Sequence, residues 1–298
     1  MTLKAPAKIN FGLWIGSKRG DGYHPVSTIF LPVALYDTVT TKINDSGLIQ
    51  LQCDTDTVPS GEDNLCWKAA DLFRQETNSD IGISIKLTKN IPVGAGLGGG
   101  SSDAAAVLMA LNRQLYGVLS DERLFSIAAG LGADIPFFLY RQACAARGIG
   151  EQLSPIVFPW EVTAVIAFPG FEICTADAYA AFDMTRSAPE PATDFNNLIM
   201  SLSSLKEARE TVGNAFEPVI FPHYPVLAEI KEQLYKEGAE YASLSGSGSA
   251  IYGLFRDEGK VRYAMKSLEQ RCRVYSAEVL RGSTGNRFFE SRLQENTE

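Results

Sequence analysis

Histidine is the scarcest ionisable residue of this chain, with only His24 and His223 among 298 residues. Two histidines so far apart in the sequence exclude a multi-histidine metal site and an H-E-x-x-H zinc helix. Cysteine is also sparse, and no C-x-x-C pair occurs among its five positions, which are Cys53, Cys66, Cys144, Cys174 and Cys272. The odd number and the irregular spacing argue against a disulfide framework and a zinc ribbon, so we expect free thiols in a reducing compartment.

Clusters of positive charge and long apolar runs are absent as well. The chain has 27 Lys and Arg against 35 Asp and Glu, a formal net charge of −8, with no basic run. Because binding to a phosphate backbone needs clustered lysine and arginine, this composition argues against nucleic acid as a partner. The chain begins without an apolar signal segment and contains no stretch of 18 apolar residues, so we expect a cytoplasmic protein without a membrane partner.

The order of elements favours an α+β fold over a doubly wound parallel sheet, because strands and helices mix without a steady βαβ rhythm. A length of 298 residues is typical of two domains. Apolar patterning predicts strands at 8–15, 27–35, 38–43, 48–53, 81–87, 162–168, 239–244, 250–255 and 274–279. It predicts helices at 64–75, with Asp63 as cap, and at 101–116, 121–129, 135–140, 175–182, 224–237 and 258–270. Residues 187–194, with two prolines, are the best linker candidate, and the polar tail 286–298 is expected to fray.

The most informative local pattern is a glycine loop between a predicted strand and an alanine-rich helix. Residues 92–106 read PVGAGLGGGSSDAAA, and five of the seven residues from Gly94 to Gly100 are glycine. Such a loop lets backbone N–H groups face one anion at a helix N-terminus, so we expect it to bind phosphate rather than to act as a flexible linker. Ser101 and Ser102 stand where the helix is predicted to begin, and their hydroxyls are candidates to cap it, to bind phosphate or to hold Mg²⁺.

Two better-known phosphate loops do not fit this segment. Residues 94–99 match G-x-G-x-x-G, but Pro92 follows the strand, and no second strand with a terminal acid follows the helix, as a Rossmann site requires. The Gly-Lys-Ser/Thr of a Walker A loop is missing. A nicotinamide-dependent oxidoreductase is therefore disfavoured.

Three further patterns are weak when each is taken alone. Lys8 and Asn10 point to one face of a predicted strand, which is either part of a site or a solvated surface. Asp134 opens an apolar run within LGADIPFF, where it is either a helix cap or a functional carboxylate. The second glycine loop, LSGSGSA at 244–250, would by itself pass for a hairpin turn.

In this order, the four patterns together resemble the GHMP kinase superfamily, whose members phosphorylate hydroxyls of small metabolites from ATP. Within it, PAKIN at 6–10, DGYH at 21–24, GLGGGSS at 96–102 and LGADIPFF at 131–138 are similar to kinases that act on 4-(cytidine 5'-diphospho)-2-C-methyl-D-erythritol in the non-mevalonate isoprenoid pathway. The long glycine loop and the tyrosine–histidine pair are the specific features, because other superfamily members have a shorter loop and lack that pair. The resemblance covers about residues 5–255.

The resemblance implies an N-terminal ribosomal protein S5 domain 2-like ATP-binding domain at 1–148 and a C-terminal ferredoxin-like α/β sandwich at 149–298, with the active site in the cleft between them. It implies that Lys8 and Asp134 are catalytic and flank the reacting hydroxyl. It assigns the cytidine-diphosphate substrate to Asn10, Tyr23, His24, Thr175 and Tyr179. It assigns ATP to Asn64, Leu65, Lys89, Pro92, Val93, Gly94, Ala95, Gly96, Leu97, Gly98, Gly99, Gly100, Ser101, Ser102, Gly246 and Gly248, with Mg²⁺ as cofactor and Ser102 as its candidate ligand.

Two rival functions remain open at this point. One is a GHMP kinase for another small molecule, such as mevalonate or homoserine, and the other is a regulator of the same fold that binds ATP and a metabolite without chemistry. The chain departs from the family pattern at Thr175, which lacks the usual neighbouring proline, and it shows no acidic Mg²⁺ ligand like those of some relatives. We expect ATP and one small-molecule substrate as partners of a monomer or a weak homodimer.

Overall fold

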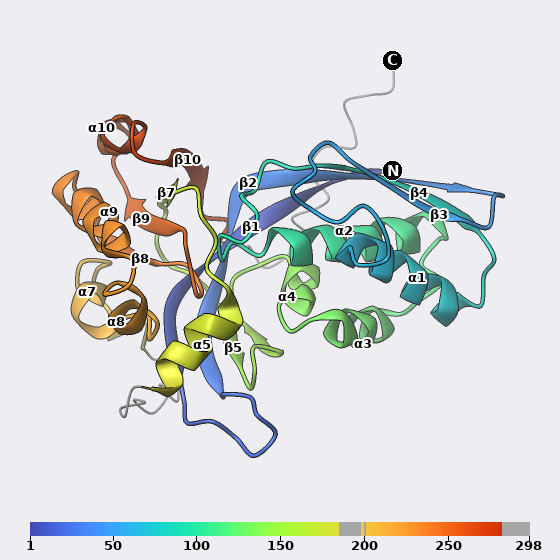
Figure 1. Ribbon diagram of the computed structural model, residues 1–298, viewed down its shortest axis with the longest axis horizontal. Coiled ribbons are helices and arrows are strands. Elements are labelled where there is room, and N and C mark those ends of the chain that lie inside the picture. The colour runs from blue at the N-terminus through green and yellow to red at the C-terminus, as the bar shows by residue number, and fades with distance from the viewer. Residues whose placement is uncertain (185–197, 200, 282–298) are drawn as a thin grey trace.

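The fold consists of two sheets with helices on their outer sides (Figure 1). The computed structural model describes residues 1–184, 198, 199 and 201–281. Within these residues, the first sheet has the order β3–β4–β2–β5–β6, with β1 also paired to β2, and the second has the order β10–β7–β9–β8. The strands of the first sheet are β1 (Thr2–Ile15), β2 (Val26–Asn44), β3 (Ile49–Cys53), β4 (Gly82–Thr88), β5 (Cys144–Arg147) and β6 (Gln152–Pro155). The second sheet contains β7 (Thr163–Phe168), β8 (Tyr241–Leu244), β9 (Ile251–Phe255) and β10 (Arg273–Glu278).

Apolar side chains divide into three clusters that hold these layers together. One cluster joins the first sheet to α1 (Leu65–Thr77), α2 (Gly99–Gln114), α3 (Asp121–Leu131) and α4 (Ile135–Tyr140). A second lies between the two sheets and includes Ala208 of α7 (Ala208–Thr211). The third joins the second sheet to α5 (Thr175–Asp183), α8 (Glu217–Ile220), α9 (Pro225–Lys236) and α10 (Glu258–Leu268). Each sheet therefore buries both of its faces, which gives the mixed α+β architecture expected from the sequence.

β1 and β2 are longer than the sequence pattern predicted. β1 begins at Thr2 rather than at residue 8, and β2 continues from Val26 to Asn44, where two separate strands were expected. The predicted break fell near Asp37, which is fully buried inside β2. Register shifts at Pro6/Ala7 and Phe11/Leu13 show that β1 contains bulges. Proline is tolerated at a bulge of an edge strand, which explains how β1 accommodates Pro6.

The helices were predicted well, but two caps were placed wrongly. α4 has the predicted bounds, and α1, α3, α5, α9 and α10 lie within two residues of theirs. α2 starts at Gly99 with Gly98 as its N-cap, so Ser101 and Ser102 lie inside the first turn and do not cap it. The cap of α1 is Asn64, whose side chain accepts a hydrogen bond from the backbone N–H of Cys66, rather than Asp63. The short elements β5, β6, α7 and α8 were not predicted.

The two predicted domains are closely joined. The backbone N–H of Leu13 donates to the carbonyl of Gly213, and that of Leu280 donates to the carbonyl of Pro32. The first sheet continues to Pro155, and the boundary at 148/149 stays a prediction. Residues 187–194 and 286–298, the predicted linker and tail, lie outside the described residues. In the part of the chain that is described, no helix is both long and apolar enough to cross a bilayer.

Candidate active site

The glycine loop lies between β4 and α2 and takes a conformation that requires glycine. Gly94, Gly96 and Gly98 have φ of +63°, +75° and +69°, the left-handed region that glycine enters without strain. A Cβ on Gly96 would lie 2.0 Å from the carbonyl oxygen of Ser245, so only glycine allows this approach. The hydroxyl of Ser245 donates to the carbonyl of Gly96 at 2.9 Å. The two glycine loops of the sequence therefore contact each other directly.

The N-terminus of α2 is left without a side-chain cap. Gly98 offers no side chain to accept from the first N–H groups, whereas Asn64, Ser120 and Asp257 cap α1, α3 and α10. The first turn of α2 also contains no acidic residue. Uncapped N–H groups and the positive end of the helix dipole favour an anion at this position, and a phosphate group meets that requirement.

A pocket on one side of the glycine loop brings together most of the residues predicted to bind ATP. Its lining consists of Val58, Pro59, Asp63, Asn64, Leu65, Cys66, Leu87, Lys89, Pro92 and the whole segment from Val93 to Ser101, together with Asp103. Three predicted ATP residues lie elsewhere. Ser102 is fully buried and is not part of this lining, Gly246 lines a neighbouring pocket, and Gly248 packs against Gly96.

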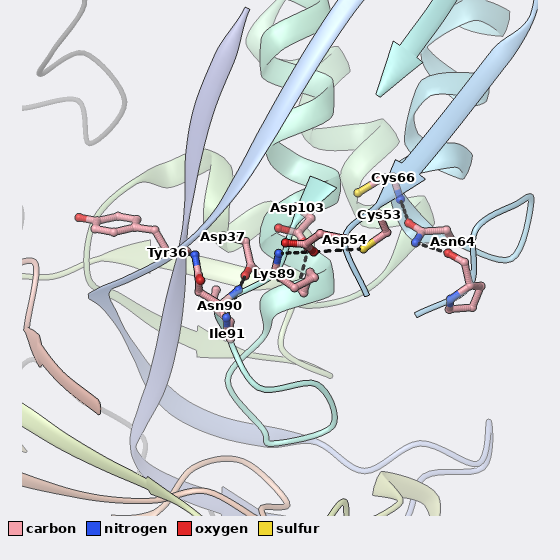
Figure 2. A network of polar contacts seen from close by, with 11 residues as sticks. Tyr36, Asp37, Cys53, Asp54, Asn64, Cys66, Lys89, Asn90, Ile91 and Asp103 are labelled. Carbon is pink, nitrogen blue, oxygen red and sulfur yellow. Dashed lines mark hydrogen bonds and ion pairs between the residues drawn. The ribbon is translucent and has the colours of Figure 1, made fainter. Parts of the chain in front are cut away.

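Lys89 and Asp103, which line this pocket, form a cluster of three charged side chains with the buried Asp37 (Figure 2). Lys89 Nζ donates to Asp103 Oδ2 at 2.7 Å and also forms an ion pair with Asp37. Burial by itself lowers the pKa of Lys89, but the two carboxylates raise it above its ordinary value. Burial raises the pKa of Asp103 to about 7, with Lys89 opposing and Asp37 adding to the shift. Asp37 and Asp103 were not among the residues predicted to be functional. Their only signal in the sequence is one acid within an apolar strand and one within an alanine-rich helix.

A second pocket lies on the other side of the glycine loop and contains the predicted catalytic pair. Its lining consists of Lys8, Asn10, Leu13, Val26, Thr28, Phe30, Gly96, Gly98, Asp134, Ile149, Gly150, Thr175, Tyr179, Phe216, Gly246 and Ser247. Gly96 and Gly98 line both pockets. Burial, followed by the negative charge of Asp134, raises the pKa of Tyr179 to about 12, so its phenol remains a neutral hydroxyl at physiological pH.

Lys8 lies at the centre of this second pocket with incomplete charge compensation. Its Nζ donates to Asn10 Oδ1 at 2.7 Å and lies 3.7 Å from Asp134 Oδ2. The side chain of Lys8 is 6% exposed and that of Asp134 37% exposed. Burial lowers the pKa of Lys8, and the carboxylate of Asp134 offsets only part of that shift. The ion pair is long enough to leave both groups available to a third partner in the pocket.

Asp134 occupies a helix-cap position without acting as a cap. It precedes Ile135 at the start of α4, but its side chain accepts no capping hydrogen bond, and its backbone is helical (φ −83°, ψ −17°) where a cap residue is normally extended. The carboxylate instead faces Lys8. The geometry favours the functional reading of this residue over the cap.

Neither His24 nor Tyr23 is part of the lining of the second pocket, but His24 contacts Tyr179, which is. The His24 ring is buried and stacks directly on Tyr179, with centroids 5.2 Å apart and planes inclined by 22°. Tyr23 is 59% exposed. The hydroxyl of Thr175 is 3.0 Å from that of Ser247, so α5 also contacts the second glycine loop.

Comparison with known proteins identifies the family. Residues 64–142 match the GHMP kinases N terminal domain, and residues 196–273 match the GHMP kinases C terminal domain. The chain is 40% identical over 279 residues to 4-diphosphocytidyl-2-C-methyl-D-erythritol kinase of Citrifermentans bemidjiense, covering 94% of this chain and 98% of that relative. The chain belongs to the 4-diphosphocytidyl-2-C-methyl-D-erythritol kinase family of GHMP kinases.

Solved structures agree with this family and with its two-domain GHMP kinase fold. A crystal structure of 4-(cytidine 5'-diphospho)-2C-methyl-D-erythritol kinase matches with a TM-score of 0.81 and 35% identity, covering 95% of this chain and 100% of that chain. A homoserine kinase from Cytophaga hutchinsonii matches with a TM-score of 0.72 but only 19% identity, covering 94% and 95%. At that identity the second likeness shows the shared fold alone. The predicted resemblance and fold class are thereby confirmed.

Proposed function

We propose that this protein is an ATP-dependent phosphotransferase with an alcohol acceptor, which phosphorylates the 2-hydroxyl of 4-(cytidine 5'-diphospho)-2-C-methyl-D-erythritol. This reaction belongs to the non-mevalonate route to isoprenoid precursors. Membership in the family supports the reaction class and ATP as the donor. The observation that carries the proposal is that Gly96 and Gly98 line both pockets, so a phosphate held by the loop borders the pocket of Lys8 and Asp134.

The Lys8–Asp134 pair supplies the groups that transfer to a hydroxyl requires. Asp134 accepts the hydroxyl proton as the oxygen attacks the γ-phosphorus, and the bond from that phosphorus to the β-phosphate oxygen breaks to release ADP. The ammonium of Lys8, 3.7 Å from the carboxylate, stabilises negative charge that develops on the transferred group. Asn10 fixes the ammonium through its Oδ1. These roles are positioning and electrostatic, as expected for phosphoryl transfer.

The cytosine of the substrate gives the enzyme a second point of attachment away from the hydroxyl. We assign it to Tyr23, His24 and Tyr179, because His24 stacks on Tyr179, which lines the second pocket, and Tyr23 precedes His24 in the chain. His24 and Tyr179 are in ring contact here, so a base stacked between them would have to separate the two rings. Stacking of a base on an aromatic ring contributes roughly 1–3 kcal/mol. Binding at this distance from the reacting atoms orients the hydroxyl.

Mg²⁺ is expected with ATP, and two oxygens fit it. The hydroxyl of Ser102 and Asp103 Oδ1 are buried and have no hydrogen-bond partner among the described residues. No group of three or more His, Cys, Asp or Glu in that part of the chain could hold a metal, which fits an ion held mainly by phosphates and one or two protein oxygens. When bound, Mg²⁺ neutralises charge on the phosphates. Ser102 and Asp103 are therefore the ligands that we propose.

A coupled assay of ADP release tests the function directly. ATP would be supplied with 4-(cytidine 5'-diphospho)-2-C-methyl-D-erythritol, mevalonate or homoserine in parallel, and turnover is expected with the cytidine compound alone. Turnover with mevalonate or homoserine would assign the chain to another GHMP kinase, and ATP binding without any turnover would make it a regulator.

The same assay tests how the base is recognised. Tyr23→Ala should raise KM for the cytidine substrate by roughly five- to 100-fold, the loss of one stacking contact, while KM for ATP stays within a factor of about two. Equal losses for both substrates would give Tyr23 a structural role and contradict the assignment.

A further inference from the structure

The carboxylate of one residue of α5 contacts two residues of the β1–β2 connection, which comprises residues 16–25. Asp183 is the last residue of α5, and Figure 1 shows this helix beside the long blue loop at the lower edge of the view. Asp183 Oδ2 accepts a hydrogen bond from Lys18 Nζ at 2.7 Å, and Asp183 Oδ1 lies 2.9 Å from His24 Nε2. Each oxygen of this carboxylate thus faces a different residue of the same loop, which is the loop that also carries Tyr23.

The imidazole of His24 is fixed on several sides. Its Nδ1 is 2.8 Å from the carbonyl oxygen of Gly16, so both ring nitrogens face oxygen atoms. One face stacks on Tyr179, and Phe182 meets the ring edge-on with centroids 5.9 Å apart. Among these neighbours, only Asp183 is both charged and partly exposed, with 30% of its side chain accessible.

We propose that Asp183 is a positioning residue that holds the His24 ring and the Tyr23–His24 segment against α5, and so sets the shape of the cytosine-binding edge of the pocket. The inference rests on the proposed function for the identity of the base. The hydrogen bond from Lys18 lowers the pKa of the Asp183 carboxyl, so the carboxylate keeps the negative charge that faces Lys18 Nζ and His24 Nε2. A loop that is held in place before the substrate arrives loses less conformational entropy on binding. Asp183 therefore acts on the affinity for the cytidine compound and leaves the phosphoryl-transfer step unchanged.

Kinetics of Asp183→Asn test the consequence for binding. The amide keeps the size of the side chain but removes the negative charge that faces Lys18 and His24, and its one oxygen can face only one of them. KM for the cytidine substrate should rise roughly three- to tenfold, because each partly exposed contact contributes modestly, while kcat and KM for ATP stay unchanged. Asp177→Asn is the matched control on the exposed side of the same helix and should leave all three constants unchanged. An unchanged KM in Asp183→Asn, or an equal rise in KM for ATP, overturns the inference.

Nitrogen-15 NMR of histidine side chains gives a readout independent of activity. The chain has only two histidines, so a His223→Gln background leaves the ring signals of His24 alone. Asp183→Asn should shift the His24 ring-nitrogen signals, and Asp177→Asn should not. Unmoved signals overturn the inference. If the wild-type enzyme does not phosphorylate the cytidine compound, the proposed function fails, and the NMR result by itself decides whether Asp183 positions His24.

Discussion

Lys8 and Lys89 are both buried and lie in the pockets on opposite sides of the glycine loop, yet their surroundings differ. Lys89 is in contact with two carboxylates, Asp37 and Asp103, and its pKa is raised. Lys8 faces one carboxylate at 3.7 Å and one amide oxygen, and its pKa is lowered. A lysine compensated by two carboxylates stabilises the fold, whereas a lysine with incomplete compensation stays available for negative charge brought by a substrate. We therefore expect Lys89 to act mainly on the stability of the fold and Lys8 mainly on phosphoryl transfer.

Loss of the carboxylate that faces Lys8 should have the largest effect. We expect Asp134→Asn to fold, to bind both substrates and to lose roughly 10²–10⁴-fold in kcat, because the amide cannot accept the proton. Lys8→Met should behave similarly, and the double variant should lose less than the product of the two factors if the pair acts as a unit. Steady-state kinetics measure this, with thermal melts and ATP binding as controls for folding. Near-normal turnover in Asp134→Asn would show that Asp134 only precedes the start of α4. The proposed difference in role between Lys8 and Lys89 would then be contradicted.

Removal of the other lysine should affect stability. Lys89→Met leaves Asp37 and Asp103 buried without a counter-charge, which typically costs about 3–5 kcal/mol in the free energy of unfolding. Adding Asp103→Asn to Lys89→Met should recover part of that loss, because one of the two uncompensated charges is removed. Urea unfolding monitored by circular dichroism measures both variants. A Lys89→Met protein as stable as wild type would show that the cluster does not hold the fold.

The raised pKa of Asp103 predicts a pH dependence of stability. With a pKa of about 7 in the folded state and an ordinary, lower value in the unfolded chain, the protonated carboxyl stabilises the fold at low pH. This contribution is complete below the unfolded pKa and is lost as the pH rises through the folded value. Between about pH 5 and 8, the free energy of unfolding of wild type should therefore fall by about 3 kcal/mol more than that of Asp103→Asn. If the free energies of unfolding of wild type and Asp103→Asn depended on pH in the same way, the raised pKa of Asp103 would be contradicted. Asp177→Asn is the control and should show the wild-type slope.

The smallest effect that we predict concerns the loop between the two lysines. A substitution of Gly98 would strain the fold as well as affect ATP binding, because Gly98 has a positive φ and a Cβ there would lie 2.8 Å from the Phe138 ring. Gly100 is a better probe, since its Cβ would meet only Leu65 at 3.7 Å, inside the nucleotide pocket. Gly100→Val should weaken ATP binding by about tenfold by crowding that pocket, with little change in melting temperature.

Gly130→Val, in an open position of α3, is the matched control for helix propensity. Titration calorimetry with ATP compares the two variants. Unchanged affinity in Gly100→Val would contradict the placement of the nucleotide.

The sequence predicted the glycine loop better than the sheet that supports it. The loop was recognisable because Gly94, Gly96 and Gly98 all have a left-handed backbone, and at Gly96 a Cβ would also lie 2.0 Å from a carbonyl oxygen, so glycine is required there. β2 was predicted as two strands with a break at residues 36 and 37, although the charge of Asp37 is compensated inside the sheet by Lys89, 52 residues further along the chain. Asp103 was missed for a similar reason, because its ion pair with Lys89 forms only in the folded chain. The stacking of His24 on Tyr179 could not be predicted from the sequence either, because it depends on how α5 packs against a loop that is distant in the chain.

The distance along the chain between Asn10 and Tyr252 has a consequence for the protein during its synthesis. The phenol of Tyr252, in β9, donates to the backbone carbonyl of Asn10 at 2.6 Å, two residues along the strand from Lys8. β1 leaves the ribosome first and can pair with β2 early, but the part of β1 that carries Lys8 reaches its final support only after β9 has emerged. A nascent chain stalled before residue 250 would therefore contain the whole glycine loop and both side chains of the proposed catalytic pair and still lack a competent enzyme.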